Sequence, residues 1–106
     1  MSYRYMRIIV FFDLPSVTYH EKKVYVKFHD FLDNEGFIML QESVYTKLVL
    51  NGSVSKSVMK KVRDNAPSKG LVQVLTVTEK QFAQIECITG SYHSNKMESE
   101  ERLVIL

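Results

Sequence analysis

The sequence predicts an α+β domain in which two helices cover one face of a four-stranded sheet. Stretches of strand length alternate with two amphipathic stretches of helix length, in the order strand, helix, strand, strand, helix, strand. Two right-handed strand–helix–strand units in this order produce a ferredoxin-like βαββαβ sandwich. The chain has 106 residues, of which 45% are hydrophobic, so we expect a single domain over residues 1–106.

The first strand is expected at residues 8–12, which are continuously apolar. A short run of β-branched and aromatic residues is typical of a central strand that is buried on both faces. Asp13 follows this run directly, and Pro15 ends the strand because proline has no amide hydrogen to donate.

The first helix is expected at residues 18–35. Thr18 and Glu21 have the spacing of a capping box, which satisfies free amides at a helix start. Gly36 is suited to the left-handed conformation that closes a helix. Between these signals, apolar residues recur with helical period and form one stripe: Val24, Phe28, Phe31 and Leu32.

Residues 37–50 are expected to form two strands that are split at residues 41–43, the least apolar part of the segment. No glycine or proline marks a turn there. The second helix follows Asn51, which can cap it, and ends at residues 65–67, where Pro67 stops it. Its apolar stripe consists of Val54, Val58, Met59 and Val62.

After a turn at residues 68–70 we expect a strand at 71–78 and a short helical turn at 78–82. Two extra strands are expected, at 85–89 and at the C-terminus (102–106), with a polar loop at 91–101. An apolar end left in water favours aggregation, so the C-terminal strand is expected to pair with the sheet of its own chain or of a partner.

Charge and composition narrow the class of protein. The formal net charge is +2, which tolerates an anionic partner without requiring one. Cys87 is the single cysteine, which excludes a disulfide within the chain; we expect it to be buried beside Ile85 and Ile88, in a cytoplasmic protein. The apolar run at 8–12 is too short for a signal peptide or a membrane span, so no membrane partner is expected.

Asp13 is the first candidate functional residue, because it places a carboxylate at the end of a central strand. From the residues alone, a structural role in accepting loop hydrogen bonds is the favoured interpretation. One carboxylate is a poor Mg²⁺ site, but a two-fold axis near Asp13 would bring a second one from another protomer. His20, His29 and His93 lack metal-ligand spacing. We expect Ser43 to act as a hydrogen-bonding group rather than a nucleophile.

A basic face is predicted on the second helix, opposite its apolar stripe. Such faces are usually only solvated, and the alternative is contact with a phosphate backbone. The candidate nucleic-acid-binding residues are Lys56, Lys60, Lys61 and Arg63.

Four segments together resemble the small CRISPR-associated proteins of family two. Residues 6–15 (MRIIVFFDLP) resemble the first strand of the family with its terminal aspartate. Residues 36–45 (GFIMLQESVY) resemble the second motif, which has a Gln-x-Ser-Val-aromatic core. Residues 75–82 (LTVTEKQF) and 102–106 (RLVIL) are similar to the subgroup from type II systems. The segments follow one another in the family's order over nearly the whole chain.

The resemblance implies a homodimer that bridges two dimers of the CRISPR integrase during spacer acquisition. The complex would capture short double-stranded DNA and insert it into the repeat array, and the C-terminal strand would cross to the partner or dock the integrase. Family members are also metal-dependent endonucleases that act on single-stranded RNA or double-stranded DNA. In that case Asp13 of both protomers would hold a Mg²⁺ ion that polarises a phosphodiester.

Two functions therefore remain open, a structural adaptor and a phosphodiesterase. One candidate acid without an evident general base slightly favours the adaptor. A third possibility, unrelated to CRISPR, is a ribonuclease toxin or a domain that binds a small regulatory ligand, because this sandwich supports many functions.

Overall fold

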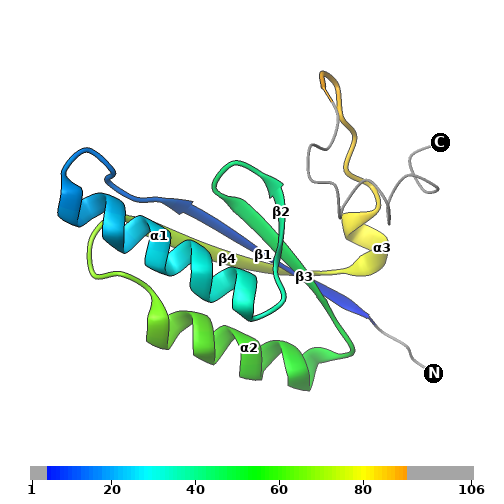
Figure 1. Cartoon of the computed structure of the whole chain (residues 1–106). Helices are drawn as coiled ribbons and strands as arrows, with labels where there is room; N and C mark the ends of the chain where they lie inside the picture. The colour runs from blue at the N-terminus through cyan, green and yellow to red at the C-terminus, as the bar shows by residue number, and fades with distance from the viewer. Residues whose placement is uncertain (1–4, 91–106) are drawn as a thin grey trace.

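The computed structural model describes residues 5–90, which form an α+β sandwich. Its elements are β1 (Met6–Asp13), α1 (Tyr19–Asn34), β2 (Ile38–Gln41), β3 (Val44–Val49), α2 (Gly52–Asn65), β4 (Leu71–Thr78) and α3 (Glu79–Phe82). The strands form one antiparallel sheet in the order β2-β3-β1-β4. Helices α1 and α2 lie side by side on one face of this sheet, and α3 follows the end of β4 (Figure 1). The predicted ferredoxin-like architecture is confirmed.

Strand β1 is central because it pairs with β3 on one side and with β4 on the other. Its alternate residues Ile8, Val10 and Phe12 pack into the core under the helices. Ile9 belongs to a second apolar cluster on the opposite face. The expectation of a strand buried on both faces is confirmed over most of its length, since Phe11 near its end is partly exposed.

Helix α1 begins at the predicted capping box. The Thr18 hydroxyl accepts a hydrogen bond from the Glu21 amide at 3.1 Å, and the Glu21 carboxylate accepts one from the Thr18 amide at 3.0 Å. The helix ends before Gly36, whose φ of 91° lies in the left-handed region. The Lys47 ammonium donates to the carbonyl of Glu35, one of the carbonyls left free at the helix end.

Helix α2 begins where Asn51 accepts a hydrogen bond from the Val54 amide at 3.0 Å. It ends at Asn65, and its buried residues are Ser55, Val58 and Val62. The predicted start, end and apolar stripe are therefore confirmed, except that Val54 is exposed.

The main core lies between the sheet and the two long helices. Phe12 is at its centre, with ring centroids 5.2 Å from Phe28, 5.6 Å from Tyr45 and 5.7 Å from Tyr25. The contacts with Phe28 and Tyr25 are edge-on and the contact with Tyr45 is stacked, and both arrangements add to the gain from burial. The buried residues of this core are Ile8, Val10, Phe12, Leu14, Phe28, Leu32, Phe37, Tyr45, Val49, Val58 and Val62.

The other face of the sheet is only partly covered. Ile9, Leu40 and Phe82 form a small buried cluster there. Around it, four large apolar side chains are at least one third exposed, and the strand register places all of them on the face opposite the helices. We call this surface the open sheet face; it consists of Phe11, Leu48, Leu71 and Leu75.

Two expectations for the end of the described chain are wrong. Residues 85–89 form no strand, because α3 turns the chain away from the sheet and Ile85 and Ile88 remain exposed. Cys87 is exposed for the same reason, rather than buried. The polar loop at 91–101 and the C-terminal strand lie outside the described residues. Among residues 5–90, no helix has the length and apolar character needed to cross a membrane.

Candidate functional site beside Asp13

Asp13 is the last residue of β1. Its side chain is exposed, whereas its backbone contacts the neighbouring strand β4 and Gly70. It pairs with Leu71 of β4, and the next residue, Leu14, is buried in the core. Gly70 packs closely against this segment: a Cβ atom at Gly70 would lie 2.7 Å from the Asp13 carbonyl oxygen. The predicted carboxylate thus stands on a rigid segment of backbone and remains accessible.

A cleft of about 550 Å³ opens beside Asp13, and we call it the Asp13 cleft. Its walls come from the end of β1 with the loop that follows, from the first turns of α1 and from the β2–β3 turn. The lining residues that can bind a polar ligand are Asp13, Ser16, Lys22, Tyr25, Glu42 and Ser43.

Ser43 connects the β2–β3 turn to β1 and to α1 through hydrogen bonds. Within residues 5–90 it is the one residue other than glycine with a positive φ, at 64°. Its carbonyl accepts a hydrogen bond from the Phe12 amide at 3.0 Å, and its hydroxyl lies 3.3 Å from the hydroxyl of Tyr25. The hydrogen-bonding role expected of Ser43 is confirmed, and the turn falls where the split between strands was predicted.

Two tyrosines near the cleft have different surroundings. Tyr25 is half-buried, and its hydroxyl reaches the cleft beside Ser43. Tyr45 is buried in the core, and burial raises its pKa to about 12. Tyr45 is therefore neutral at physiological pH and cannot serve as a base.

The groups that line the cleft fit a hard divalent cation. Asp13 and Glu42 supply carboxylate oxygens, and Ser16 and Ser43 supply hydroxyl oxygens, which are the ligand types that Mg²⁺ prefers. In the part of the chain that the structure describes, no three His, Cys, Asp or Glu side chains gather closely enough to hold a metal ion. A metal ion at Asp13 would therefore need additional ligands, from substrate, water or a second chain.

The predicted basic residues of α2 lie elsewhere, on its solvent face, and none of them lines the Asp13 cleft. Lys60 forms an ion pair with Asp64 at 2.8 Å, and Lys61 forms one with Glu35 at 3.5 Å. Asp64 and Glu35 therefore partly neutralise the charges of Lys60 and Lys61. Most of the remaining positive charge on this helix face comes from Lys56 and Arg63.

Neither of the two histidines in residues 5–90 lines this cleft. His20 is exposed at the start of α1, where it borders a separate groove near the end of α2. His29 is half-buried beside Asp30 and the ring of Tyr45. His93 lies outside the described residues.

Sequence reasoning did not identify Lys22, Tyr25 and Glu42 as members of the site. Lys22 and Tyr25 are three residues apart on one helix, a spacing that places them on one face but does not show what they face. Glu42 lies in the polar stretch at 41–43 where the strand split was predicted, and within the motif at 36–45, but neither signal shows which residues it faces. Only the fold brings α1 and the β2–β3 turn next to Asp13 at the end of β1.

The chain is similar to known CRISPR proteins over most of its length. The family model described as CRISPR associated protein Cas2 matches residues 6–85. A Treponema denticola protein named CRISPR-associated endoribonuclease Cas2 is 50% identical over 101 residues, which cover 95% of this chain and all of that protein. A Streptococcus mutans protein of the same name is 46% identical over 101 residues, covering 95% of this chain and 93% of the relative.

A relative from Ligilactobacillus salivarius with this name is 42% identical over 101 residues, which cover 95% of this chain and all of the relative. The family match spans the four strands, all three helices and the Asp13 cleft. The resemblance inferred from the sequence motifs is thereby confirmed: this chain belongs to the CRISPR-associated Cas2 family.

Proposed function

We propose that the protein is a homodimeric subunit of CRISPR spacer acquisition that also hydrolyses phosphodiester bonds at the Asp13 cleft. The observation that carries the hydrolytic part is the cleft itself, where an accessible carboxylate on rigid backbone adjoins a second carboxylate, a lysine and two hydroxyls that hydrogen-bond to each other. The names of the relatives, which are called endoribonucleases, support single-stranded RNA as a substrate. Double-stranded DNA is the second candidate.

Asp13 and Glu42 are the residues that would hold Mg²⁺ in this cleft. When bound, the ion would polarise the phosphodiester and activate water at neutral pH. The backbone of Asp13 is fixed by its pairing with Leu71 and by the close packing of Gly70, so ligand binding has to order only the side chain. No histidine of residues 5–90 lines the cleft, and the activation of water is therefore assigned to the ion rather than to a side chain.

The open sheet face supports the homodimer. It exposes four large apolar side chains on one face of the antiparallel sheet, which is unfavourable in water unless another surface covers them. Asp13 is at the rim of this face, because it lies two residues after Phe11 on β1, on the same side of the sheet, and pairs with Leu71. A second copy packed face to face on a two-fold axis would cover the apolar side chains and bring two Asp13 residues towards each other.

Family membership and the surfaces outside the cleft support the proposed adaptor function. The basic residues of α2 provide contacts to the phosphates of duplex prespacer DNA, independent of base sequence. The apolar segment at 102–106 is a candidate contact for the integrase or for the partner chain. In this role the integrase performs the insertion chemistry, and the present chain positions the DNA between two integrase dimers.

The hydrolytic function is tested with Asp13→Asn, which removes the charge and keeps the shape. We expect wild type to cleave single-stranded RNA or duplex DNA only with Mg²⁺, and Asp13→Asn to lose this activity. Asp30→Asn is the matched control, since Asp30 is exposed on α1 and does not line the cleft. Cleavage by Asp13→Asn at the wild-type rate would show that the cleft is not the active site.

The acquisition role is tested in the same preparations by adding the integrase and measuring prespacer insertion into a repeat. If Asp13→Asn loses cleavage and retains insertion, the protein acts as an adaptor in acquisition, and hydrolysis is a separate activity. If a folded Asp13→Asn dimer loses both, hydrolysis belongs to acquisition. Insertion by the integrase at the same rate without this chain would contradict the adaptor role.

A further inference from the structure

The Asp13 cleft holds a cation and a pair of hydroxyl groups besides its carboxylates. We propose that Lys22 and the hydroxyl pair of Tyr25 and Ser43 bind the substrate phosphate next to Asp13, with Lys22 supplying charge and the hydroxyl pair setting orientation. This inference rests on the proposed hydrolytic function and names the groups that would hold its substrate. Lys22 is then a substrate-binding residue of the cleft, and Tyr25 and Ser43 fix the phosphate in position.

Lys22 is free to serve an anionic ligand. It lies in the first turns of α1, its side chain is exposed, and it lines the cleft together with Asp13. It forms no ion pair with any residue in the range 5–90, whereas Lys60 and Lys61 of α2 are both paired. An exposed ammonium is a compact point charge that binds phosphate oxygens well.

The charges of the cleft make this contact depend on a divalent cation. Asp13 and Glu42 contribute −2 and Lys22 contributes +1, so the formal sum is −1. A phosphodiester, itself negative, is repelled by that sum and attracted once a divalent cation makes it +1. We therefore expect Lys22 to assist the cation and not to replace it.

The Tyr25–Ser43 pair presents one hydroxyl hydrogen to the cleft. The two oxygens are 3.3 Å apart, so one hydroxyl donates to the other and the acceptor keeps its own hydrogen free. That remaining hydrogen can donate to a phosphate oxygen. The pair thus offers a donor where the α1 wall, which also carries Lys22, meets the wall formed by the β2–β3 turn.

Both hydroxyls are held in place before any ligand binds. The ring of Tyr25 packs edge-on against Phe12 at 5.7 Å, and the Ser43 carbonyl accepts the amide hydrogen of Phe12 at 3.0 Å. The left-handed backbone of Ser43 directs its side chain towards Tyr25, although this conformation is uncommon for serine. Functional sites often keep such conformations, because a fixed donor loses little freedom on binding.

The test compares Lys22→Gln with Lys23→Gln in full-length protein that cleaves a single-stranded RNA oligonucleotide with Mg²⁺. The two variants lose the same charge at adjacent positions of one helix, and Lys23 does not line the cleft. We expect Lys22→Gln to raise KM about tenfold, the effect of one charge-assisted hydrogen bond, and Lys22→Arg to restore most of it. Lys23→Gln is expected to remain within about twofold of wild type.

The hydroxyl pair is tested with Tyr25→Phe, which keeps the ring packed against Phe12 and removes only the oxygen. We expect kcat to fall about tenfold while the melting temperature changes by less than about 3 °C. If the pair serves only to hold the turn on the helix, the melting temperature falls and kcat of the folded protein stays at the wild-type value. Ser43→Ala provides an independent removal of the other oxygen.

The outcomes separate this inference from the function on which it rests. Absence of Mg²⁺-dependent cleavage in wild type, or full cleavage by Asp13→Asn, overturns both. If wild type cleaves and Asp13→Asn does not, the hydrolytic function stands. Equal KM values for Lys22→Gln and Lys23→Gln, or an unchanged kcat for both Tyr25→Phe and Ser43→Ala, then overturn the assignment of the phosphate site alone.

Discussion

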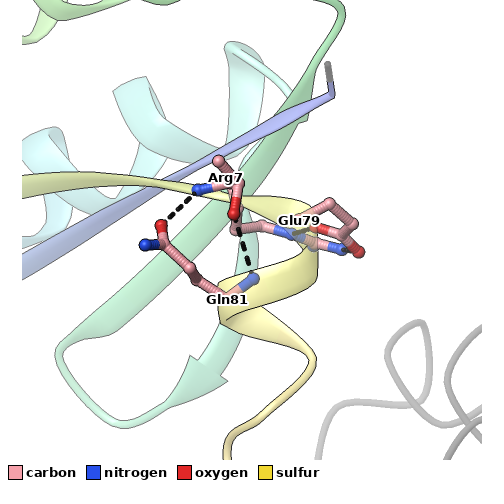
Figure 2. A network of polar contacts seen from close by, with 4 residues as sticks. Arg7, Glu79 and Gln81 are labelled. Atoms are coloured by element: carbon pink, nitrogen blue, oxygen red, sulfur yellow. Dashed lines mark hydrogen bonds and ion pairs between the residues drawn. The ribbon is translucent and has the colours of Figure 1, made fainter. Parts of the chain in front are cut away.

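Arg7 and Glu79 form a bidentate ion pair that fastens α3 to β1. The Arg7 Nε donates to Glu79 Oε1 at 2.8 Å, and Nη2 donates to Oε2 at 2.6 Å. The guanidinium also lies 4.3 Å from the ring centre of Phe82, and Arg7 is only 5% exposed. Figure 2 shows Arg7 and Glu79 at the start of α3, beside Gln81 of the same helical turn. The pair sets the direction in which the chain continues beyond β4.

Breaking the pair from one side should destabilise the domain. Glu79→Gln removes the carboxylate that accepts two hydrogen bonds from the buried Arg7 guanidinium, and a loss of about 2 kcal/mol in the free energy of unfolding is expected, below the full cost of a buried pair because Glu79 is partly exposed. Urea unfolding measures the loss. Arg7→Met combined with Glu79→Gln should lose less than the sum of the two single changes, and strict additivity would contradict the coupling.

Gly70→Ala should damage both the fold and the Asp13 segment. Gly70 has φ of 89°, and the added Cβ would lie 2.7 Å from the Asp13 carbonyl oxygen and 2.9 Å from a methyl carbon of Leu14. We expect a loss of about 2 kcal/mol or more in chemical unfolding. Gly52→Ala is the matched control: its φ is not positive and no atom lies within 4 Å of the added carbon, so stability should not fall.

The strain in the left-handed backbone of Ser43 can be measured by comparing two substitutions at this position. Ser43→Ala and Ser43→Gly both remove the hydroxyl, but only glycine adopts φ of 64° without strain. We expect the alanine variant to be less stable than the glycine variant by about 1 kcal/mol in thermal unfolding. Equal stability would show that the β2–β3 turn relaxes out of the left-handed conformation.

The capping box of α1 should make stability depend on pH at the acid end. Hydrogen bonds from the backbone amides of Thr18 and Val17 lower the pKa of Glu21 below 4.5. A carboxyl whose pKa is lowered by folding stabilises the fold above its unfolded pKa, and this contribution disappears as pH falls through the folded pKa. Glu21→Gln should therefore lose less stability than wild type between pH 7 and pH 3. A wild-type fall no larger than that of the variant would contradict the assignment.

The four basic residues of α2 should contribute unequally to binding of duplex DNA. Lys60 and Lys61 already face Asp64 and Glu35, whereas Lys56 and Arg63 form no ion pair with a residue in the described range. Lys56→Ala with Arg63→Ala should reduce the salt slope of binding by about 2, and Lys60→Ala with Lys61→Ala by less. If neither pair of changes reduces the slope, this face does not contact DNA.

The open sheet face should control the oligomeric state. Leu75→Glu places a charge in its middle and is expected to convert a dimer into a monomer in sedimentation equilibrium of the full chain. Val26→Glu, a similar change at an exposed position of α1, should leave the dimer intact. A monomeric wild type would contradict the homodimer. If the Leu75→Glu variant remained a dimer, another surface would mediate dimerisation, and some other segment would cover the open sheet face.

Signals confined to a few neighbouring residues were enough to predict most of the fold. The apolar run at 8–12, the Thr18–Glu21 box and the Asn51 cap act within one turn of helix or along one strand, so each can be identified without its tertiary partner. The order of these elements then left few possible topologies. Asp13 was identified for the same reason, since it follows the most apolar strand directly.

Tertiary structure decided which residues surround Asp13 and which surfaces stay exposed. Ser43 makes a turn without glycine because the Phe12 amide and the Tyr25 hydroxyl hold it there, and both partners are distant in sequence. Residues 85–89 have strand-like composition but α3 turns them away from the sheet, which also exposes Cys87. Contacts between segments that are far apart in the chain have no local pattern, so only the folded arrangement shows the cleft that Asp13 shares with Lys22.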